Sequence, residues 1–127
     1  MTKDNKNNLP KVTIVTTVWN LYEAGRVETF RQMMESVHNQ TYPNLEHIII
    51  NNNSTDETEN LIQEYVDKGY VAKVYFEKTQ GLWHGMNRGI KEATGEFINF
   101  MNSDDYFYCD DAVEVSIKAI LKAGADW

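Results

Sequence analysis

Two adjacent carboxylates, Asp104 and Asp105, end the segment Phe97–Asp105, in which an apolar run leads into a short polar turn. Such a run predicts a buried strand that brings both carboxylates to its carboxyl end. Mg²⁺ and Mn²⁺ take oxygen ligands, commonly one or two carboxylates together with phosphate oxygens of a substrate. The pair therefore indicates a metal site. A turn or a helix cap, the commoner role of Asp-Asp in a loop, is the competing interpretation.

Three consecutive asparagines follow another apolar run, residues 48–50. Side-chain amides beside a helix N-terminus could contact the edge of a nucleobase, and Asn51 is the candidate because it lies nearest the predicted strand end. The competing interpretation places the asparagines at turn positions with positive φ. Ser54 and Glu57 have the spacing of a capping box that starts the next helix, and with Asp56 they are assigned structural roles.

A third segment, residues 81–90, carries three glycines at helical spacing. Glycines allow close backbone approach, but the segment matches no phosphate-binding loop, and Walker, Rossmann and nucleophile-elbow patterns are absent from the sequence. His84 and Arg88 could each be a ligand contact, although a solvated helix surface is the commoner role of both. Zinc is disfavoured because His38 and His47 lack partners at metal-ligand spacing.

Strand-like and helix-like segments alternate along the chain. Apolar spacing predicts strands over 12–18, 45–50, 71–76 and 97–101, and helices over 24–40, 54–69, 81–94 and 110–124. Strict alternation predicts a Rossmann-like α/β/α fold of three layers with a mainly parallel sheet. Ligands of such sheets lie outside the carboxyl ends of the strands, where the polar segments 19–20, 51–53 and 103–105 should meet.

Composition narrows the classes of partner. The 127 residues suit one domain, and a net charge of −7 gives no general attraction for nucleic acid or anionic lipid. We therefore expect no nucleic-acid partner, and a bound diphosphate would need a local device such as a metal or a helix N-terminus. The single cysteine, Cys109, excludes an intramolecular disulfide and favours a reducing compartment, and the two aspartates after it disfavour a role as nucleophile.

No apolar run approaches the roughly 18 residues that a membrane helix needs, and no signal peptide is visible, so the prediction is a cytoplasmic protein. Peripheral attachment at the inner membrane face stays open. Residues 1–10 are expected to be a disordered or extended segment, and residues 11–127 to form the folded domain. Residues 125–127 have the pattern of an entry to a fifth strand, which favours a domain truncated at its C-terminus.

Together these segments resemble a family 2 glycosyltransferase of the GT-A type. The matching segments are residues 12–20, 48–56, 80–90 and 93–105. The second is similar to the family's strand followed by D-(D/G/N)-x-S-x-D, and the last is similar to the block that ends in the family's D-D metal motif. Any one match would be weak, whereas four in order, spanning nearly the whole chain from Lys11, are specific.

The resemblance implies a site for a nucleotide-diphosphate sugar, most commonly a UDP-sugar, with a divalent Mn²⁺ or Mg²⁺. Asp105 would bind the cation, and Asp104 would contact the ribose or a metal-bound water. The nucleotide-binding positions of the family fall on Thr17, Val18, Trp19, Asn51, Gly81, His84 and Asn87. Two departures affect the nucleotide side: an asparagine replaces the family's base-pairing carboxylate at position 51, and histidine stands where the family often has aspartate.

The implied activity is transfer of the sugar to a hydroxyl of an acceptor glycan or lipid-linked glycan, in bacterial-type polysaccharide or glycoconjugate synthesis. The family's general base lies well downstream of the D-D motif, so its counterpart is expected beyond Trp127, and this chain alone is expected to be inactive in transfer. One alternative is a non-catalytic nucleotide- or metal-binding module. Another is a sugar nucleotidyltransferase, but residues 21–26 lack the glycine-rich basic loop that this class needs after its first strand.

Overall fold

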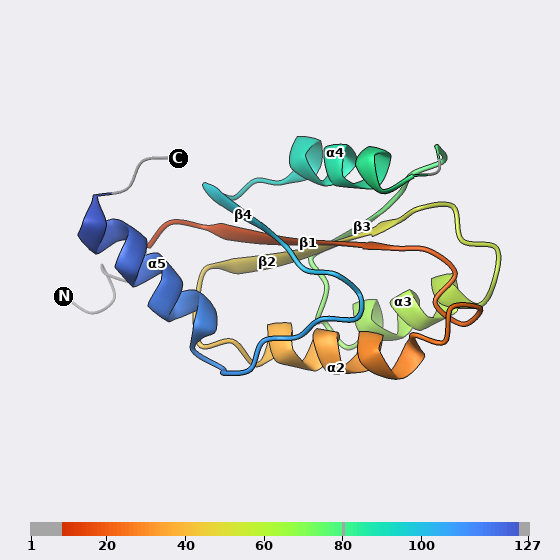
Figure 1. The fold of residues 1–127 in the computed structure, drawn as a ribbon, viewed down its shortest axis with the longest axis horizontal. Helices are drawn as coiled ribbons and strands as arrows, with labels where there is room; N and C mark the ends of the chain where they lie inside the picture. Colours follow the sequence, from red (N-terminus) through yellow and green to blue (C-terminus); the bar gives the residue numbers. More distant parts are fainter. Residues whose placement is uncertain (1–8, 80, 125–127) are drawn as a thin grey trace.

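The computed structural model describes residues 9–79 and 81–124, in which four strands alternate with four helices (Figure 1). The strands are β1 (Val12–Val18), β2 (Leu45–Asn51), β3 (Lys73–Phe76) and β4 (Phe97–Phe100), and the helices are α2 (Val27–His38), α3 (Thr58–Asp67), α4 (Leu82–Glu92) and α5 (Ala112–Ala123). This order confirms the predicted α/β fold.

All strand pairs of the sheet are parallel, and the strand order is β3-β2-β1-β4. The strand β1 pairs with β2 from Val12↔Leu45 to Val18↔Asn51, and with β4 from Val12↔Phe97 to Val15↔Phe100. The chain therefore builds outward from β1 in one direction and then crosses over to β4 on its other side. This reversal puts a topological switch point at the carboxyl ends of β1 and β4.

Helices lie on both sides of the sheet (Figure 1): α2 and α3 are on one side and α4 is on the other. The larger core lies between the sheet and α2, α3 and α5; it includes Ile14, Phe30, Ile49, Leu61 and Ile117. A smaller core on the α4 side contains Val15, Ile48 and Ile50. The strands β1 and β2 are buried along nearly their whole length on both faces, which is expected of central parallel strands.

The helix α4 packs very closely on β1 because two of its residues lack side chains. A Cβ atom added at Gly89 would lie 2.3 Å from Val15 Cγ1, and one added at Gly85 would lie 2.9 Å from Thr17 Cγ2. A glycine inside a helix costs about 1 kcal/mol relative to alanine. The tight contact with the sheet explains why α4 carries glycine at both positions.

The buried carboxylate of Glu46 connects the chain near the amino ends of β1 and β2. Its Oε2 accepts hydrogen bonds from Thr13 Oγ1 at 2.7 Å and from the backbone nitrogen of Thr94 at 3.0 Å, and Lys11 Nζ lies 3.4 Å from its Oε1. Burial alone would raise the pKa of Glu46, but these hydrogen bonds and the charge of Lys11 lower it to about 2. Glu46 thereby joins β1, β2 and the turn after α4.

Local structure differs from the sequence prediction at several helix ends. The predicted capping box of Ser54 and Glu57 is wrong: α3 begins at Thr58, and Glu57 makes no side-chain cap hydrogen bond. Ser54 Oγ instead accepts a hydrogen bond from the backbone nitrogen of Asn20 at 3.0 Å. The helix α2 begins three residues later than predicted, since a turn with Gly25 at φ 71° precedes it.

The predicted segment before the domain and the predicted fifth strand fall largely on residues 1–8 and 125–127, which lie outside the described residues. None of the helices in the described ranges has the length and apolar character needed to cross a membrane.

We expect Gly89→Ala to lower the free energy of unfolding by about 2 kcal/mol, because overpacking against Val15 outweighs the gain in helix propensity. Urea unfolding followed by circular dichroism measures this change. Lys91→Ala, an exposed substitution in the same helix, is the control and should stay within about 0.5 kcal/mol of the wild type. A Gly89→Ala protein as stable as that control would show that the close packing is not required.

A second prediction concerns His47, which is buried in the core. Its Nε2 lies 2.9 Å from Thr16 Oγ1, and its Nδ1 has no hydrogen-bond partner among the described residues. Burial lowers the pKa of His47 from 6.5 to about 3. The folded protein therefore keeps this imidazole neutral, while the unfolded chain takes up a proton as the pH falls below 6.5.

Stability should accordingly fall with decreasing pH, at up to about 1.4 kcal/mol per pH unit between pH 6.5 and 4.5. Below pH 4.5 the depressed pKa of Glu46 adds a further loss of the same sign. Urea unfolding across this range, compared between the wild type and His47→Leu, measures the effect. An unchanged slope between pH 6.5 and 4.5 in His47→Leu would contradict the assignment.

Candidate functional site

A cleft of about 430 Å³ lies at the carboxyl ends of the strands, where the strand order reverses. The residues that line it are Thr17, Val18, Trp19, Ala24, Arg26, Asn52, Gly81, Leu82 and Ser103. They come from the ends of β1 and β2, the loop before α2, the start of α4 and the loop after β4. This is the edge at which the sequence predicts the polar segments to meet.

The end of β1 supplies one wall of the cleft. Val18 is buried, whereas the side chain of Trp19 is 54% exposed and Asn20 turns the backbone at φ 46°. The indole of Trp19 therefore forms an exposed aromatic surface beside the cleft. A flat ring in this position can stack on a nucleobase or a sugar ring.

Asn52 holds the end of β2 to the beginning of α4. Its backbone nitrogen donates to the carbonyl oxygen of Val18 at 2.8 Å, and its Nδ2 donates to the carbonyl oxygen of Gly81 at 2.8 Å. Since the carbonyl oxygen of Gly81 can only accept a hydrogen bond, the group facing it must be Nδ2, and this fixes the orientation of the Asn52 side-chain amide. The side-chain Oδ1 is buried without a hydrogen-bond partner among the described residues. An unpaired buried acceptor costs about 1–3 kcal/mol, which marks a place for a donor from a ligand or water.

Asn51, the predicted ligand residue, is buried at the end of β2. It is the last residue of β2, it is 3% exposed, and its Oδ1 accepts a hydrogen bond from the backbone nitrogen of Ser54 at 3.2 Å. Asn51 is not among the residues that line the cleft. Its neighbour Asn52, which sequence reasoning did not select, is.

The loop that carries Trp19 and Arg26 is fixed by Asp56. One carboxylate oxygen, Oδ2, accepts from the backbone nitrogens of Tyr22 at 3.0 Å and Glu23 at 3.1 Å, while Oδ1 accepts from the backbone nitrogen of Thr58 at 2.9 Å. Burial alone would raise the pKa of Asp56, but these hydrogen bonds lower it. Asp56 therefore has the structural role that the sequence assigns to it.

Asp104 and Asp105 lie exposed in the loop after β4, beside the cleft-lining Ser103. The backbone nitrogen of Asp105 donates to the carbonyl oxygen of Asn102 at 3.1 Å, and Asn102 Nδ2 donates to Asp105 Oδ2 at 3.2 Å. Within residues 9–79 and 81–124 no three His, Cys, Asp or Glu side chains gather as a metal cluster. Two exposed carboxylates fit a Mg²⁺ or Mn²⁺ ion whose remaining ligands are phosphate oxygens and water.

Three candidates on α4 lie apart from the cleft lining. His84 and Asn87 are exposed, and neither lines the cleft. Arg88 is committed to structural contacts: its Nε lies 3.0 Å from Glu92 Oε2, and its guanidinium reaches Glu77 at 3.6 Å. Arg88 is therefore a half-buried, ion-paired side chain and not the solvated surface charge that is common for a helical arginine. Gly81, in contrast, does line the cleft.

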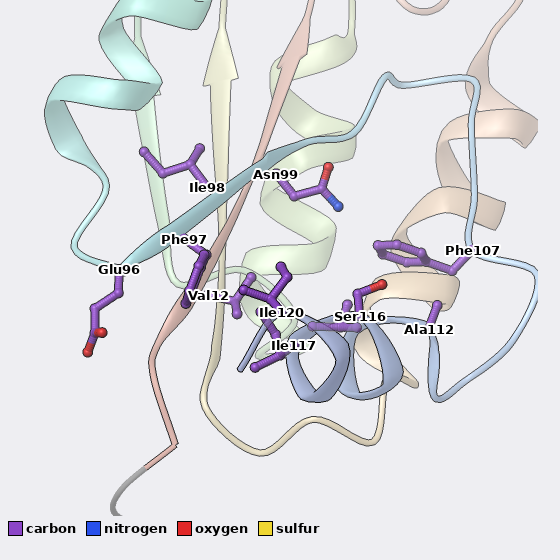
Figure 2. A pocket seen from close by; sticks show the side chains of 11 residues that line it. Val12, Glu96, Phe97, Ile98, Asn99, Phe107, Ala112, Ser116, Ile117 and Ile120 are labelled. Carbon is purple, nitrogen blue, oxygen red and sulfur yellow. The ribbon is translucent and has the colours of Figure 1, made fainter. Parts of the chain in front are cut away.

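A second hollow, of about 490 Å³, lies between β4 and α5 (Figure 2). Most of its wall is apolar, with Val12, Phe97, Ile117 and Ile120 among the lining residues. Figure 2 shows the carboxylate of Glu96 directed away from α5. This hollow includes the beginnings of β1 and β4, at the opposite end of the sheet from the cleft. The cleft is therefore the candidate site for a polar ligand.

The sequence over residues 13–127 matches the family described as Glycosyl transferase family 2. The chain belongs to this family. It is 38% identical over 105 residues to EpsH of Bacillus subtilis, a match that covers 80% of this chain and 29% of that protein. It is 33% identical over 117 residues to an uncharacterized glycosyltransferase of Haemophilus influenzae, covering 91% of this chain and 44% of the relative. The chain thus spans less than half the length of these relatives.

Solved structures confirm the GT-A-like fold. TarS 1–349 of S. aureus in complex with UDP superposes with a TM-score of 0.75 at 22% identity, covering 88% of this chain and 32% of the other. The mannosyltransferase PcManGT from Pyrobaculum calidifontis, in complex with GDP-Man and Mn²⁺, gives a TM-score of 0.78 at 21% identity, covering 91% and 33%.

Removing the Asp56 carboxylate should loosen the loop before α2. Asp56→Ala is expected to lower the free energy of unfolding by about 2 kcal/mol, because several backbone donors lose their acceptor. Urea unfolding measures the loss. Glu59→Ala, which removes an exposed acid from α3, serves as the control and should change stability by less than about 0.5 kcal/mol. Equal stability of the two variants would contradict the role given to Asp56.

Proposed function

We propose that this chain is the donor-binding part of a metal-dependent glycosyltransferase and holds a nucleotide-diphosphate sugar in the cleft at the carboxyl ends of β1, β2 and β4. The observation that carries the proposal is the arrangement of three features at one cleft: the exposed ring of Trp19, the buried acceptor Oδ1 of Asn52, which has no partner among the described residues, and two carboxylates in the adjoining loop after β4. Membership of the family and the two ligand-bound structural neighbours support it.

The nucleotide side is assigned to Trp19 and Asn52. Trp19 offers a face on which a base stacks, and Thr17 and Val18 form the adjacent wall. Asn52 Oδ1 accepts a hydrogen bond from the ring N–H of a base such as uracil or guanine, since its Nδ2 is already committed to Gly81. We assign this role to Asn52 in place of Asn51. His84 and Asn87 remain proposed contacts at the edge of the nucleotide.

The metal side is assigned to the loop after β4. Asp105 would hold a Mn²⁺ or Mg²⁺ ion, with Asp104 contacting it through water or contacting the ribose. The bound ion would act as a Lewis acid for the departing diphosphate. Ser103, which directly precedes the two aspartates, is buried at the cleft wall, while both carboxylates are exposed.

The transfer step needs groups beyond those assigned here. A hydroxyl of the acceptor, a glycan or lipid-linked glycan, attacks the anomeric carbon of the sugar and loses its proton to a general base carboxylate. We place that base downstream of Trp127, so this chain binds the donor without transferring the sugar. The setting that fits is polysaccharide or glycoconjugate synthesis in the cytoplasm or at the inner face of the membrane.

Calorimetric titration of UDP and of GDP, with and without Mn²⁺, tests the proposal. We expect one of the two nucleotides to bind, with an affinity that rises in Mn²⁺ and falls at least tenfold in Asp105→Asn because the ion loses a charged ligand. Asp110→Asn, an exposed acid further along the same loop, is the matched control and should bind like the wild type.

The same titration distinguishes the two asparagines. Asn52→Ala should weaken nucleotide binding about tenfold through loss of the acceptor, whereas Asn51→Ala should act mainly on stability. Thermal unfolding of each variant separates the two effects. Absence of binding by folded wild-type protein for both nucleotides, with Mn²⁺ present, would overturn the proposed function.

A further inference from the structure

Arg26 places a positive charge at the cleft of a chain whose net charge is −7. It is the last residue of the loop between β1 and α2, and it lines the cleft together with Trp19 and Gly81. Among the described residues that line the cleft it is the one cation. The sequence analysis gave it no role.

The guanidinium of Arg26 is not committed to another group. The sequence has three arginines; Arg31 contacts Glu64 at 2.6 Å and Arg88 contacts Glu92 at 3.0 Å. Over residues 9–79 and 81–124, the side chain of Arg26 makes no hydrogen bond and no ion pair. Two of the arginines therefore form ion pairs within the fold, and the donors of the one at the cleft are bound by none of the described residues.

The backbone beneath this side chain is fixed. The nitrogen of Arg26 donates to the carbonyl oxygen of Leu21 at 2.9 Å, and its carbonyl oxygen accepts from the nitrogen of Phe30 at 2.9 Å. Asp56 holds the preceding residues Tyr22 and Glu23. A charged group on a fixed root loses less entropy when it binds than one on a mobile loop.

The charge balance of the site calls for such a group. The charge of a divalent cation held by Asp105, with Asp104 beside it, would be offset by these two carboxylates, so the negative charge of a diphosphate would stay largely uncompensated. A guanidinium matches phosphate oxygens with two parallel donors and keeps its charge at all relevant pH values. Resting on the proposed function, we propose that Arg26 binds a phosphate group of the nucleotide-diphosphate donor.

The test compares ligands that differ only in phosphate. UDP, UMP and uridine are titrated in Mn²⁺ into the wild type, Arg26→Ala and Arg26→Lys, and GDP, GMP and guanosine are titrated in the same way. In Arg26→Ala we expect the affinity for the diphosphate to fall about tenfold and the affinity for the nucleoside to stay unchanged. Arg26→Lys should recover part of the loss, because it keeps the charge without the planar fork.

Lys91→Ala, which removes an exposed cation of α4, is the matched control and should bind every ligand like the wild type. An equal loss for nucleoside and diphosphate in Arg26→Ala would overturn the inference, since Arg26 would then act on the base or on the loop. Unchanged diphosphate binding would also overturn it. If the wild-type protein binds neither diphosphate, the proposed function is wrong and the inference falls with it. This outcome is seen in the wild type, whereas the other two are seen only in Arg26→Ala.

Discussion

The cleft depends on the contact between α4 and β1. Glycines occur at every fourth position of this segment, so Gly81, Gly85 and Gly89 share one side of it. Gly89 lies over Val15, Gly85 lies over Thr17, and the carbonyl of Gly81 receives the amide of Asn52. Because no side chain separates the helix from the sheet, the first turn of α4 comes down to the level of the strand ends. A larger residue would lift the helix and open the wall of the cleft.

Much of the fold follows from the sequence because the central strands are buried on both faces. Such strands produce apolar runs that local periodicity detects, and strict alternation with helices leaves a parallel sheet as the simple solution. Helix starts are less predictable, since they depend on partners far along the chain. Ser54 has the right spacing to cap α3, yet its hydroxyl binds the backbone of Asn20, 34 residues away. The capping-box pattern spans only four neighbouring residues, so it cannot show that a backbone nitrogen elsewhere in the chain binds the Ser54 hydroxyl.

The candidate site, like the fold, could be predicted only in part from the sequence. The sequence locates the edge of the sheet and the segments that reach it, but it does not show which of two adjacent asparagines faces the cleft. Side chains alternate along a strand: Ile49 packs in the core beside α2 and α3, whereas Ile50 packs on the α4 side. Asn51 is therefore on the same face as Ile49, and Asn52 is on the same face as Ile50. Knowing that α4 forms the cleft wall would have selected Asn52. Arg26 lies in a loop with no periodicity, and the residues before it, Tyr22 and Glu23, are held by Asp56 from far along the chain.

An acidic protein can hold an anion only through short-range interactions. At physiological ionic strength the field of a surface charge decays over about 8 Å, so the net charge of −7 has little influence inside a cleft whose walls carry mostly neutral groups. Within that distance the balance differs from that of the whole chain. None of the described residues that line the cleft is acidic, and Arg26 is among them. Asp104 and Asp105 lie in the adjoining loop after β4, where a cation can offset them, and the carboxylate of Asp56 is bound to backbone nitrogens. The two ends of a bound nucleotide diphosphate would thus meet different chemistry: aromatic and amide groups at the base, and positive charge at the phosphates. This separation would let a chain without general affinity for polyanions bind the small anionic ligand proposed for it.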